Sequence, residues 1–198
     1  MPGKPDQTGN KLGMWLFLYT EIILFGALFV LYAVYFSWYT QDFILGAKVL
    51  DLGFGVINTI ILLVSSFLVA ASITAVQKNQ RNIALAALAG ALVCGAVFLV
   101  NKYFEWGHKI ETGIYPGSEK LLDGPAPQNL FFGLYYVVTG LHGIHIVIGM
   151  VLLAVSFGLV FCRKITAAND AVLDNCGLYW HLVDLIWIFI FPLFYLVV

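Results

Sequence analysis

Long apolar segments separated by short polar stretches form the main pattern of this 198-residue chain. Five of these segments are long enough to cross a bilayer as helices, which takes roughly 20 residues each. They lie near residues 12–37, 54–76, 83–106, 130–161 and 177–198. Strands of a β-barrel would instead appear as short segments of alternating polarity. The pattern therefore predicts an all-α fold, a polytopic membrane bundle of five transmembrane helices that forms a single domain over residues 1–198.

Composition supports an integral membrane protein and excludes an ordinary soluble domain. Apolar residues make up 61% of the chain and charged residues 11%, whereas soluble domains are about 25% charged. With a net charge of −1 and no basic patch, nothing indicates binding to nucleic acid. The three cysteines form no CxxC pair, so free thiols are expected. The first apolar segment is too long for the core of a secretory signal and is expected to remain in the mature chain.

Basic residues near the ends of the apolar segments predict the orientation. Six of them fall on the same side of the membrane as the N-terminus: Lys4, Lys11, Lys78, Arg81, Arg163 and Lys164. Four fall on the other side, spread over longer loops: Lys48, Lys102, Lys109 and Lys120. Short loops rich in Lys and Arg stay in the cytoplasm. We therefore expect a cytoplasmic N-terminus and an external C-terminus.

Ionisable residues inside the apolar segments are the candidate functional residues. His142 and His145 lie in the apolar stretch 135–149, and Glu21 lies roughly 14 Å deep in the first segment. His181 and Asp184 are three residues apart in the last segment and therefore share a helix face. Because such groups are costly in lipid, they face protein and often mark ion or proton paths.

Three roles are open for these side chains. Haem or metal ligation would need histidines at matching depth, yet His142 is expected near mid-membrane and His181 only about 5 Å inside the inner boundary. Proton transport by this chain alone would need carboxylates stepping across the whole bilayer, and no single predicted helix supplies them. The third and plainer interpretation is that the histidines hydrogen-bond to neighbouring helices, to Glu21 or to lipid head groups.

Small residues predict where helices pack closely, because they let two backbones approach each other. The glycines expected at such contacts are Gly90, Gly95, Gly140, Gly143 and Gly149. On this interpretation, Leu in place of Gly143 should harm assembly. Asn58, Ser65 and Ser72 are seven residues apart and predict a further packing stripe.

The end of the third segment and the stretch that follows it are more polar. We interpret the residues at this end as an interfacial set: Asn101, Lys102, Tyr103, Glu105 and Trp106. Residues 107–129 are rich in Gly and Pro and predict a loop without a domain of its own. The chain contains no nucleophile, phosphate-binding or zinc-protease motif. Buried polar groups without a complete catalytic centre are typical of a subunit that supports a partner.

Motifs on four of the five predicted helices resemble, in the same order, those of subunit III of the haem-copper terminal oxidases. Residues 136–149, YVVTGLHGIHIVIG, are similar to the central signature of that family. Residues 179–187, YWHLVDLIW, are similar to its last-helix motif. Residues 17–29, which contain TEIILFG, resemble the helix that bears its membrane-buried glutamate. Asn58-Thr59 followed by Ser65-Ser66 resembles the next helix.

The resemblance implies a non-catalytic subunit bound to the catalytic subunit I and to other oxidase subunits, in a bacterial plasma membrane. Haem and copper are then expected on the partners, with no redox cofactor, catalytic residue or metal on this chain. The implied roles are in assembly, turnover stability and proton uptake of a proton-translocating cytochrome c or quinol oxidase. Glu21 matches the glutamate of the family that reacts with carbodiimides. Bound phospholipid is also implied, although the two N-terminal helices that line the lipid cleft of longer members have no counterpart here.

Two alternatives remain at this point. An accessory protein of a nitric oxide reductase from the same superfamily would share almost all of these sequence features. An independent membrane haem protein or transporter would instead show a haem absorbance band or substrate flux for the chain alone.

Overall fold

The computed structural model describes residues 7–197; Lys4, which contributed to the predicted orientation, lies outside this range. The described residues form seven helices: α1 (Gln7–Trp38), α2 (Thr40–Ala47), α3 (Leu52–Gln77), α4 (Arg81–Glu111), α5 (Glu119–Leu122), α6 (Ala126–Phe161) and α7 (Ala171–Tyr195). Five of them are long and apolar enough to cross a membrane, namely α1, α3, α4, α6 and α7. The predicted bundle of five transmembrane helices is therefore confirmed.

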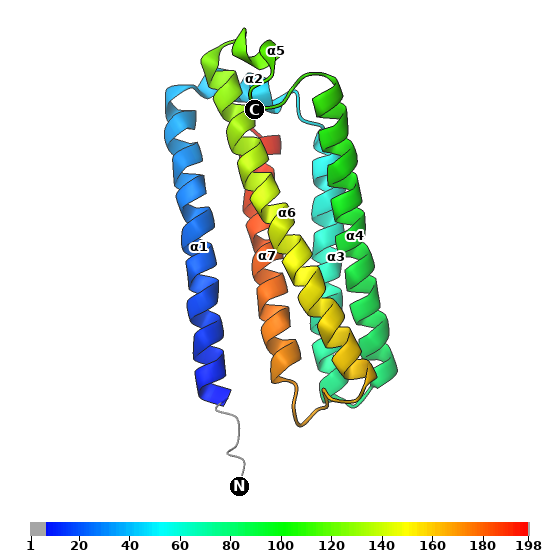
Figure 1. Cartoon of the computed structure of the whole chain (residues 1–198). Coiled ribbons are helices and arrows are strands. Elements are labelled where there is room, and N and C mark those ends of the chain that lie inside the picture. Colours follow the sequence, from blue (N-terminus) through cyan, green and yellow to red (C-terminus); the bar gives the residue numbers. More distant parts are fainter. Residues whose placement is uncertain (1–6, 198) are drawn as a thin grey trace.

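The long helices run up and down side by side, with the end of α7 at the opposite end of the bundle from the start of α1 (Figure 1). All five begin before the predicted limits, because polar residues at the ends continue the helical hydrogen bonding, whereas α6 ends at the predicted residue and α7 ends short of it. The largest difference is in α7, which begins at Ala171 instead of residue 177 and ends at Tyr195. The third segment likewise continues to Glu111 instead of stopping near residue 106.

Two short helices, which the hydropathy pattern did not predict, occupy connections at the C-terminal end of the bundle (Figure 1). Helix α2 follows α1 directly and buries Phe43 against the ring of Phe131 on α6. Helix α5 begins at Ser118, whose side chain accepts a hydrogen bond from the amide of Leu121. The predicted loop 107–129 therefore contains helix over much of its length.

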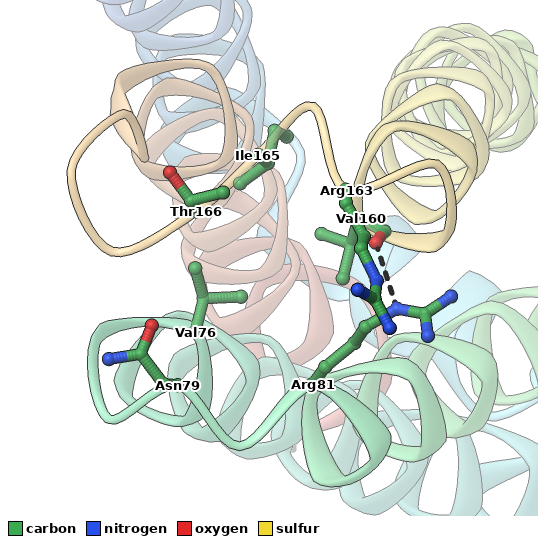
Figure 2. Close-up of a pocket in the computed structure, with 7 residues that line it drawn as sticks. All are labelled: Val76, Asn79, Arg81, Val160, Arg163, Ile165 and Thr166. Carbon is green, nitrogen blue, oxygen red and sulfur yellow. Dashed lines mark hydrogen bonds between the residues drawn. The ribbon is translucent and has the colours of Figure 1, made fainter.

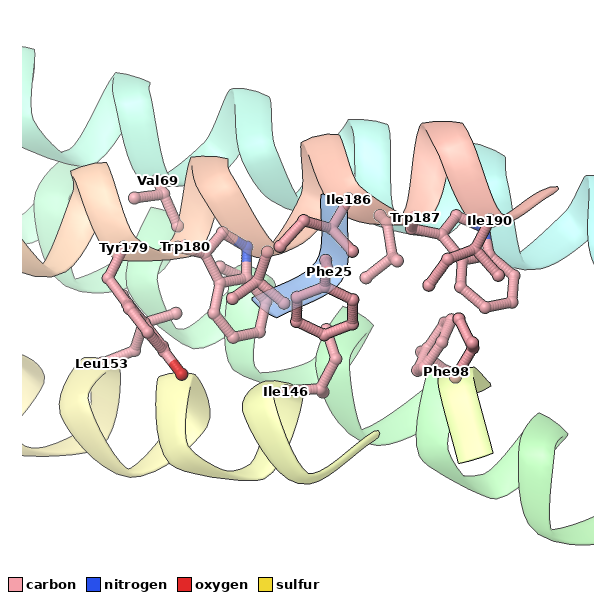
Figure 3. Close-up of a cluster of buried hydrophobic side chains, with 14 of the residues drawn as sticks. Phe25, Val69, Phe98, Ile146, Leu153, Tyr179, Trp180, Ile186, Trp187 and Ile190 are labelled. Atoms are coloured by element: carbon pink, nitrogen blue, oxygen red, sulfur yellow. The ribbon is translucent and has the colours of Figure 1, made fainter. Parts of the chain in front are cut away.

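The core lies between α3, α4, α6 and α7 and is rich in large aromatic side chains (Figure 3). Trp187 of α7 meets the ring of Phe98 of α4 edge-on, with ring centroids 4.9 Å apart. Trp180 donates its indole N–H to the Ser65 hydroxyl over 3.0 Å, and Trp187 donates to Thr59 over the same distance. Each buried indole thereby satisfies its polar atom while its ring fills space between helices.

Helix α1 stands apart from this core (Figure 1). Only 11% of its most apolar window is buried, compared with 33% to 50% for the other membrane helices. Its buried residues Leu18, Phe25 and Tyr32 are seven positions apart and so form one narrow stripe. Because its buried residues form this one stripe, α1 is attached to the bundle along a single line, and most of its apolar surface is uncovered.

Candidate functional site

The structure joins Glu21 of α1 to His145 of α6. Nε2 of His145 lies 2.8 Å from Oε2 of Glu21, and Nδ1 of the same ring lies 2.8 Å from the carbonyl oxygen of Leu141. The ring of Phe25 covers the imidazole edge-on, with centroids 5.2 Å apart. Glu21 is 14 residues from the start of α1 and 17 from its end, which places the pair near the middle of the helix.

The hydrogen bonds of His145 define how many protons the pair holds. A carbonyl oxygen can only accept, so Nδ1 must carry a proton to bond to Leu141. If Nε2 is also protonated, an imidazolium faces a carboxylate; if it is not, a neutral imidazole accepts from a carboxylic acid. In both cases one further proton is shared between Glu21 and His145. The geometry therefore describes a hydrogen-bonded pair near the middle of α1, with one proton between Nε2 and Oε2.

His142 does not make the hydrogen bonds expected of it. Its ring is fully buried, 5.2 Å from the ring of Trp187 and 5.6 Å from that of Phe98. Neither ring nitrogen has a hydrogen-bond partner among the described residues. The expectation that both histidines of α6 act as polar ties is thus met by His145 and wrong for His142, because aromatic rings surround the latter.

His181 and Asp184 lie on the inward side of α7, away from the Glu21–His145 pair. Nδ1 of His181 is 2.6 Å from the hydroxyl of Ser66 on α3. Asp184 is buried, and its oxygens accept no hydrogen bond of normal geometry from the described part of the chain. No group of three or more His, Cys, Asp and Glu that could hold a metal forms within the described residues.

The structure places His181 further along its helix than the predicted start at residue 177 implied. Because α7 begins at Ala171, His181 lies ten residues, or about 15 Å, into the helix instead of about 5 Å. It is still far from His142, which packs on Trp187, six residues or about 9 Å further along α7. The two histidines therefore lie at different levels along the bundle.

A polar network that the sequence interpretation missed joins α4, α6 and the end of α7. The Lys102 ammonium donates to Oε2 of Glu105 over 2.9 Å and to the hydroxyl of Tyr195 over 2.7 Å. Tyr135 and Tyr195 in turn donate to Oε1 of Glu105 over 2.6 and 2.7 Å. The ammonium also lies 4.9 Å from the centroid of the Trp187 ring. All four members of this Lys102 network are buried.

The Lys102 network corrects the interpretation of residues 101–106 as an interfacial set. Lys102 and Glu105 point into the bundle, whereas Tyr103 on the same helix is largely exposed. A signal was present in the sequence, because Phe98, Lys102, Glu105 and Lys109 follow one stripe of α4 and all four are buried. The stripe alone also fits charges that face head groups near a helix end, so it does not by itself identify an internal ion pair.

Comparison with known proteins decides the family. A family model described as cytochrome c oxidase subunit III matches residues 3–197. The chain belongs to the cytochrome c oxidase subunit III family. Relatives include the cytochrome bo(3) ubiquinol oxidase subunit 3 of Pseudomonas aeruginosa, 29% identical over 96% of this chain and 87% of the relative. The probable quinol oxidase subunit 3 of Staphylococcus haemolyticus is 28% identical over 95% of this chain and 89% of the relative.

A third relative differs in organisation. The heme-copper oxidase subunit I+III of Aeropyrum pernix is 32% identical over 94% of this chain but only 22% of its own length. The predicted resemblance is therefore confirmed. This chain is a multi-pass membrane subunit III of a haem-copper terminal oxidase, and subunits of this family generally carry no catalytic centre and no redox cofactor.

The glycines of the subunit III chain differ in what surrounds them. An added Cβ would lie 2.7 Å from the Trp180 ring at Gly149, 3.1 Å from it at Gly95 and 3.2 Å from the Trp106 ring at Gly140. At Gly90 it would lie 3.0 Å from Leu68. At Gly143, in contrast, neighbouring described elements leave open space within 4 Å. Gly143 borders a groove of about 400 Å³ between α4 and α6, so its predicted close helix contact is not made within this chain.

Two arginines line a hollow of about 320 Å³ at the N-terminal end of the bundle (Figure 2). Arg81, at the start of α4, donates to the carbonyl oxygens of Val160 and Phe161 at the end of α6. Arg163 lies just beyond that helix end with a positive φ of 56°. The guanidinium of Arg81 thus caps the end of α6, adding a second donor to the Val160 carbonyl, which the Arg163 amide also reaches, and bonding the Phe161 carbonyl.

Proposed function

We propose that this subunit III supports assembly, turnover stability and proton uptake of the catalytic subunit I, and that the Glu21–His145 pair takes part in proton uptake. The complex lies in a bacterial plasma membrane, with the N-terminus of this chain in the cytoplasm and its C-terminus outside. Haem and copper belong to the partner subunits. Membrane phospholipid is an additional ligand of the complex.

The shared proton of the Glu21–His145 pair carries this proposal. An ionisable pair near mid-membrane is expensive to maintain, and such groups commonly belong to proton or ion pathways. Glu21 is joined to the bundle from the helix that is least buried, so the pair lies at the edge of the subunit and not at its centre. A group that holds one proton at this edge is placed to exchange it with a neighbouring subunit.

The remaining buried polar residues support packing more directly than proton transfer. His142 lies between aromatic rings without a polar partner among the described residues. His181 bonds to Ser66, and Asp184 lies on the same inward face of α7. We therefore assign proton handling to Glu21 and His145, and structural roles to His142, His181 and Asp184.

The test is Glu21→Gln in the complete oxidase, with Glu111→Gln as the matched control at the exposed end of α4. Glutamine keeps the size of glutamate and can still hydrogen-bond to His145 through its amide, but it cannot gain or lose the proton. We expect unchanged subunit composition, slower proton uptake and a several-fold lower number of turnovers before inactivation, measured with quinol and with reduced cytochrome c as donors. Wild-type proton uptake and lifetime in Glu21→Gln would reduce the pair to a packing contact. A wild-type chain that purifies without a haem- and copper-bearing partner would contradict the whole proposal.

A further inference from the structure

We infer that Tyr135 and Tyr195 are a redox-active pair, which donates an electron to oxygen-centred radicals while Glu105 accepts the phenolic proton. The inference does not depend on proton uptake through Glu21. It also requires no cofactor on this chain, because the oxidised group is a side chain. This subunit belongs to an oxidase, and incomplete reduction of dioxygen produces radicals of this class.

The hydroxyls of Tyr135 and Tyr195 are hydrogen-bonded to a group that can take their protons. Both donate to Oε1 of Glu105, over 2.6 and 2.7 Å. The Lys102 ammonium lies 2.9 Å from Oε2, so the acceptor is an ion-paired carboxylate. Loss of an electron makes a phenol strongly acidic. A carboxylate that is already in place therefore accepts the proton as the electron leaves.

Other tyrosines in the described part of the chain have a different kind of acceptor. The hydroxyls of Tyr32, Tyr136 and Tyr179 each donate to a backbone carbonyl oxygen. A carbonyl oxygen accepts a hydrogen bond but does not take up the proton. Coupled loss of an electron and a proton is therefore favoured at Tyr135 and Tyr195.

A row of aromatic rings connects the tyrosine pair to the bundle surface. The ring centroids of Trp106 and Tyr136 are 5.1 Å apart, and that of Tyr135 follows 5.3 Å from Tyr136. Tyr195 lies 6.2 Å beyond Tyr135. Trp106 is half-buried and lines the groove of about 400 Å³ between α4 and α6. Because electron transfer slows steeply with distance, these closely spaced rings can carry an electron from the buried pair to an oxidant in the groove.

The Lys102 ammonium determines which ring keeps the oxidised state. It lies 4.9 Å from the ring centroid of Trp187 and 5.2 Å from the centroids of both tyrosines. A tryptophan that loses an electron first becomes a cation, which the ammonium repels. A tyrosine that passes its proton to Glu105 is instead a neutral radical. An oxidised Trp187, 6.4 Å from Tyr195, would therefore take an electron from the tyrosine pair.

One electron and one proton leave the tyrosine together. The oxygen-centred radical gains the electron and becomes an oxyanion, which water protonates. The O–H bond of Tyr135 or Tyr195 breaks, the proton passes to Oε1 of Glu105, and a neutral tyrosyl radical remains. The second hydroxyl, 3.1 Å away, is within reach to donate to the radical oxygen. A hydroquinone then supplies one electron, becoming a semiquinone and releasing a proton to water, while Glu105 returns the phenolic proton.

Flash photolysis of the intact oxidase complex tests the tyrosine pair. A ruthenium tris-bipyridine label on Tyr103→Cys, an exposed position that lines the same groove, is photo-oxidised with a cobalt(III) acceptor. The complex without this substitution, treated in the same way, gives the background. We expect a tyrosyl EPR signal that narrows with ring-deuterated tyrosine and is several-fold weaker when Tyr135→Phe and Tyr195→Phe are combined. Tyr32→Phe, at a buried tyrosine bonded to a carbonyl, is the matched control and should keep the signal. An undiminished signal in the double variant would overturn the inference.

Proton transfer to Glu105 has its own test. The tyrosyl signal should form several-fold more slowly in Glu105→Gln, and more slowly in D2O than in H2O. The solvent comparison uses the unchanged site, so it decides the point even where Glu105→Gln does not assemble. Equal rates in the two solvents would show that no proton moves with the electron and would overturn the role of Glu105. Glu21→Gln should leave the signal unchanged, so failure of the proton-uptake proposal is distinguishable from failure of this one.

Discussion

The Lys102 network allows a prediction in which two destabilising substitutions together cost less than one alone. Glu105→Leu leaves the Lys102 ammonium buried without its counter-ion and removes the acceptor of both tyrosine hydroxyls. Breaking a buried ion pair from one side costs roughly 3–5 kcal/mol. We therefore expect the free energy of unfolding to fall by about that amount in Glu105→Leu.

Lys102→Met should be milder. The Glu105 carboxylate keeps hydrogen bonds from Tyr135 and Tyr195 at 2.6 and 2.7 Å, and the methionine chain can still pack against the Trp187 ring. The lost charge-assisted bond to Glu105 is worth about 1.5–3 kcal/mol. In the double variant no unpaired charge remains, and the two tyrosine hydroxyls, 3.1 Å apart, can bond to each other.

The assay is a thermodynamic cycle measured by unfolding in mixed detergent and SDS micelles, followed by circular dichroism. We expect Lys102→Met combined with Glu105→Leu to be more stable than Glu105→Leu alone, which requires a coupling energy larger than the roughly 1.5–3 kcal/mol that Lys102→Met costs by itself. Glu111→Leu, an exposed change on the same helix, should stay within about 0.5 kcal/mol of wild type. If the losses in unfolding free energy of the two single variants sum to that of the double variant, Lys102 and Glu105 do not interact as described.

Three further substitutions follow from the packing. Gly149→Leu should lower stability by about 1–3 kcal/mol, because the leucine side chain would overlap the Trp180 ring. Gly158→Leu on the same helix has open space around it and should be tolerated. Similar melting temperatures for the two variants would contradict this prediction. Ser65→Ala should cost about 1–3 kcal/mol by leaving the Trp180 indole N–H unpaired. In the Ser65→Ala variant, Trp180→Phe should then lower the free energy of unfolding by less than it does in the wild-type chain. Gly143→Leu fills an open groove, so the isolated chain should keep its melting temperature, and any loss of complex yield would come from a partner.

The positions of the membrane helices follow from sequence because long apolar segments have one favourable structure in lipid. Helix α2 escaped prediction because its eight residues are too few and too mixed in polarity to stand out beside a membrane span. The start of α7 was misplaced because residues 171–176 include Asp174 and Asn175, which extend the helix without raising its hydropathy. Local composition predicts spans better than it predicts where hydrogen bonding ends.

The candidate site divides in a similar way. Pairing of Glu21 with His145 was among the expected contacts, because a carboxyl group in an apolar segment needs a polar neighbour and the other segments contain few polar side chains. The surroundings of His142 depend on which side of α6 faces the aromatic core. The spacing of two histidines three residues apart does not determine that side. Lys102 and Glu105 near a helix end have the same pattern whether they face head groups or the interior. Only the packing of Tyr135 and Tyr195 from other helices distinguishes these cases.

The narrow attachment of α1 has a consequence for biogenesis. Its polar contacts are with late parts of the chain, since 124 residues separate Glu21 from His145 and 161 separate Tyr32 from Leu193, whose carbonyl accepts its hydroxyl. At a synthesis rate of about 5–20 residues per second, α1 waits on the order of ten seconds before α6 arrives. During that interval Glu21 has no partner from α6 in its own chain. Helix α1 is thus secured by these hydrogen bonds only after α6 and α7 have been made.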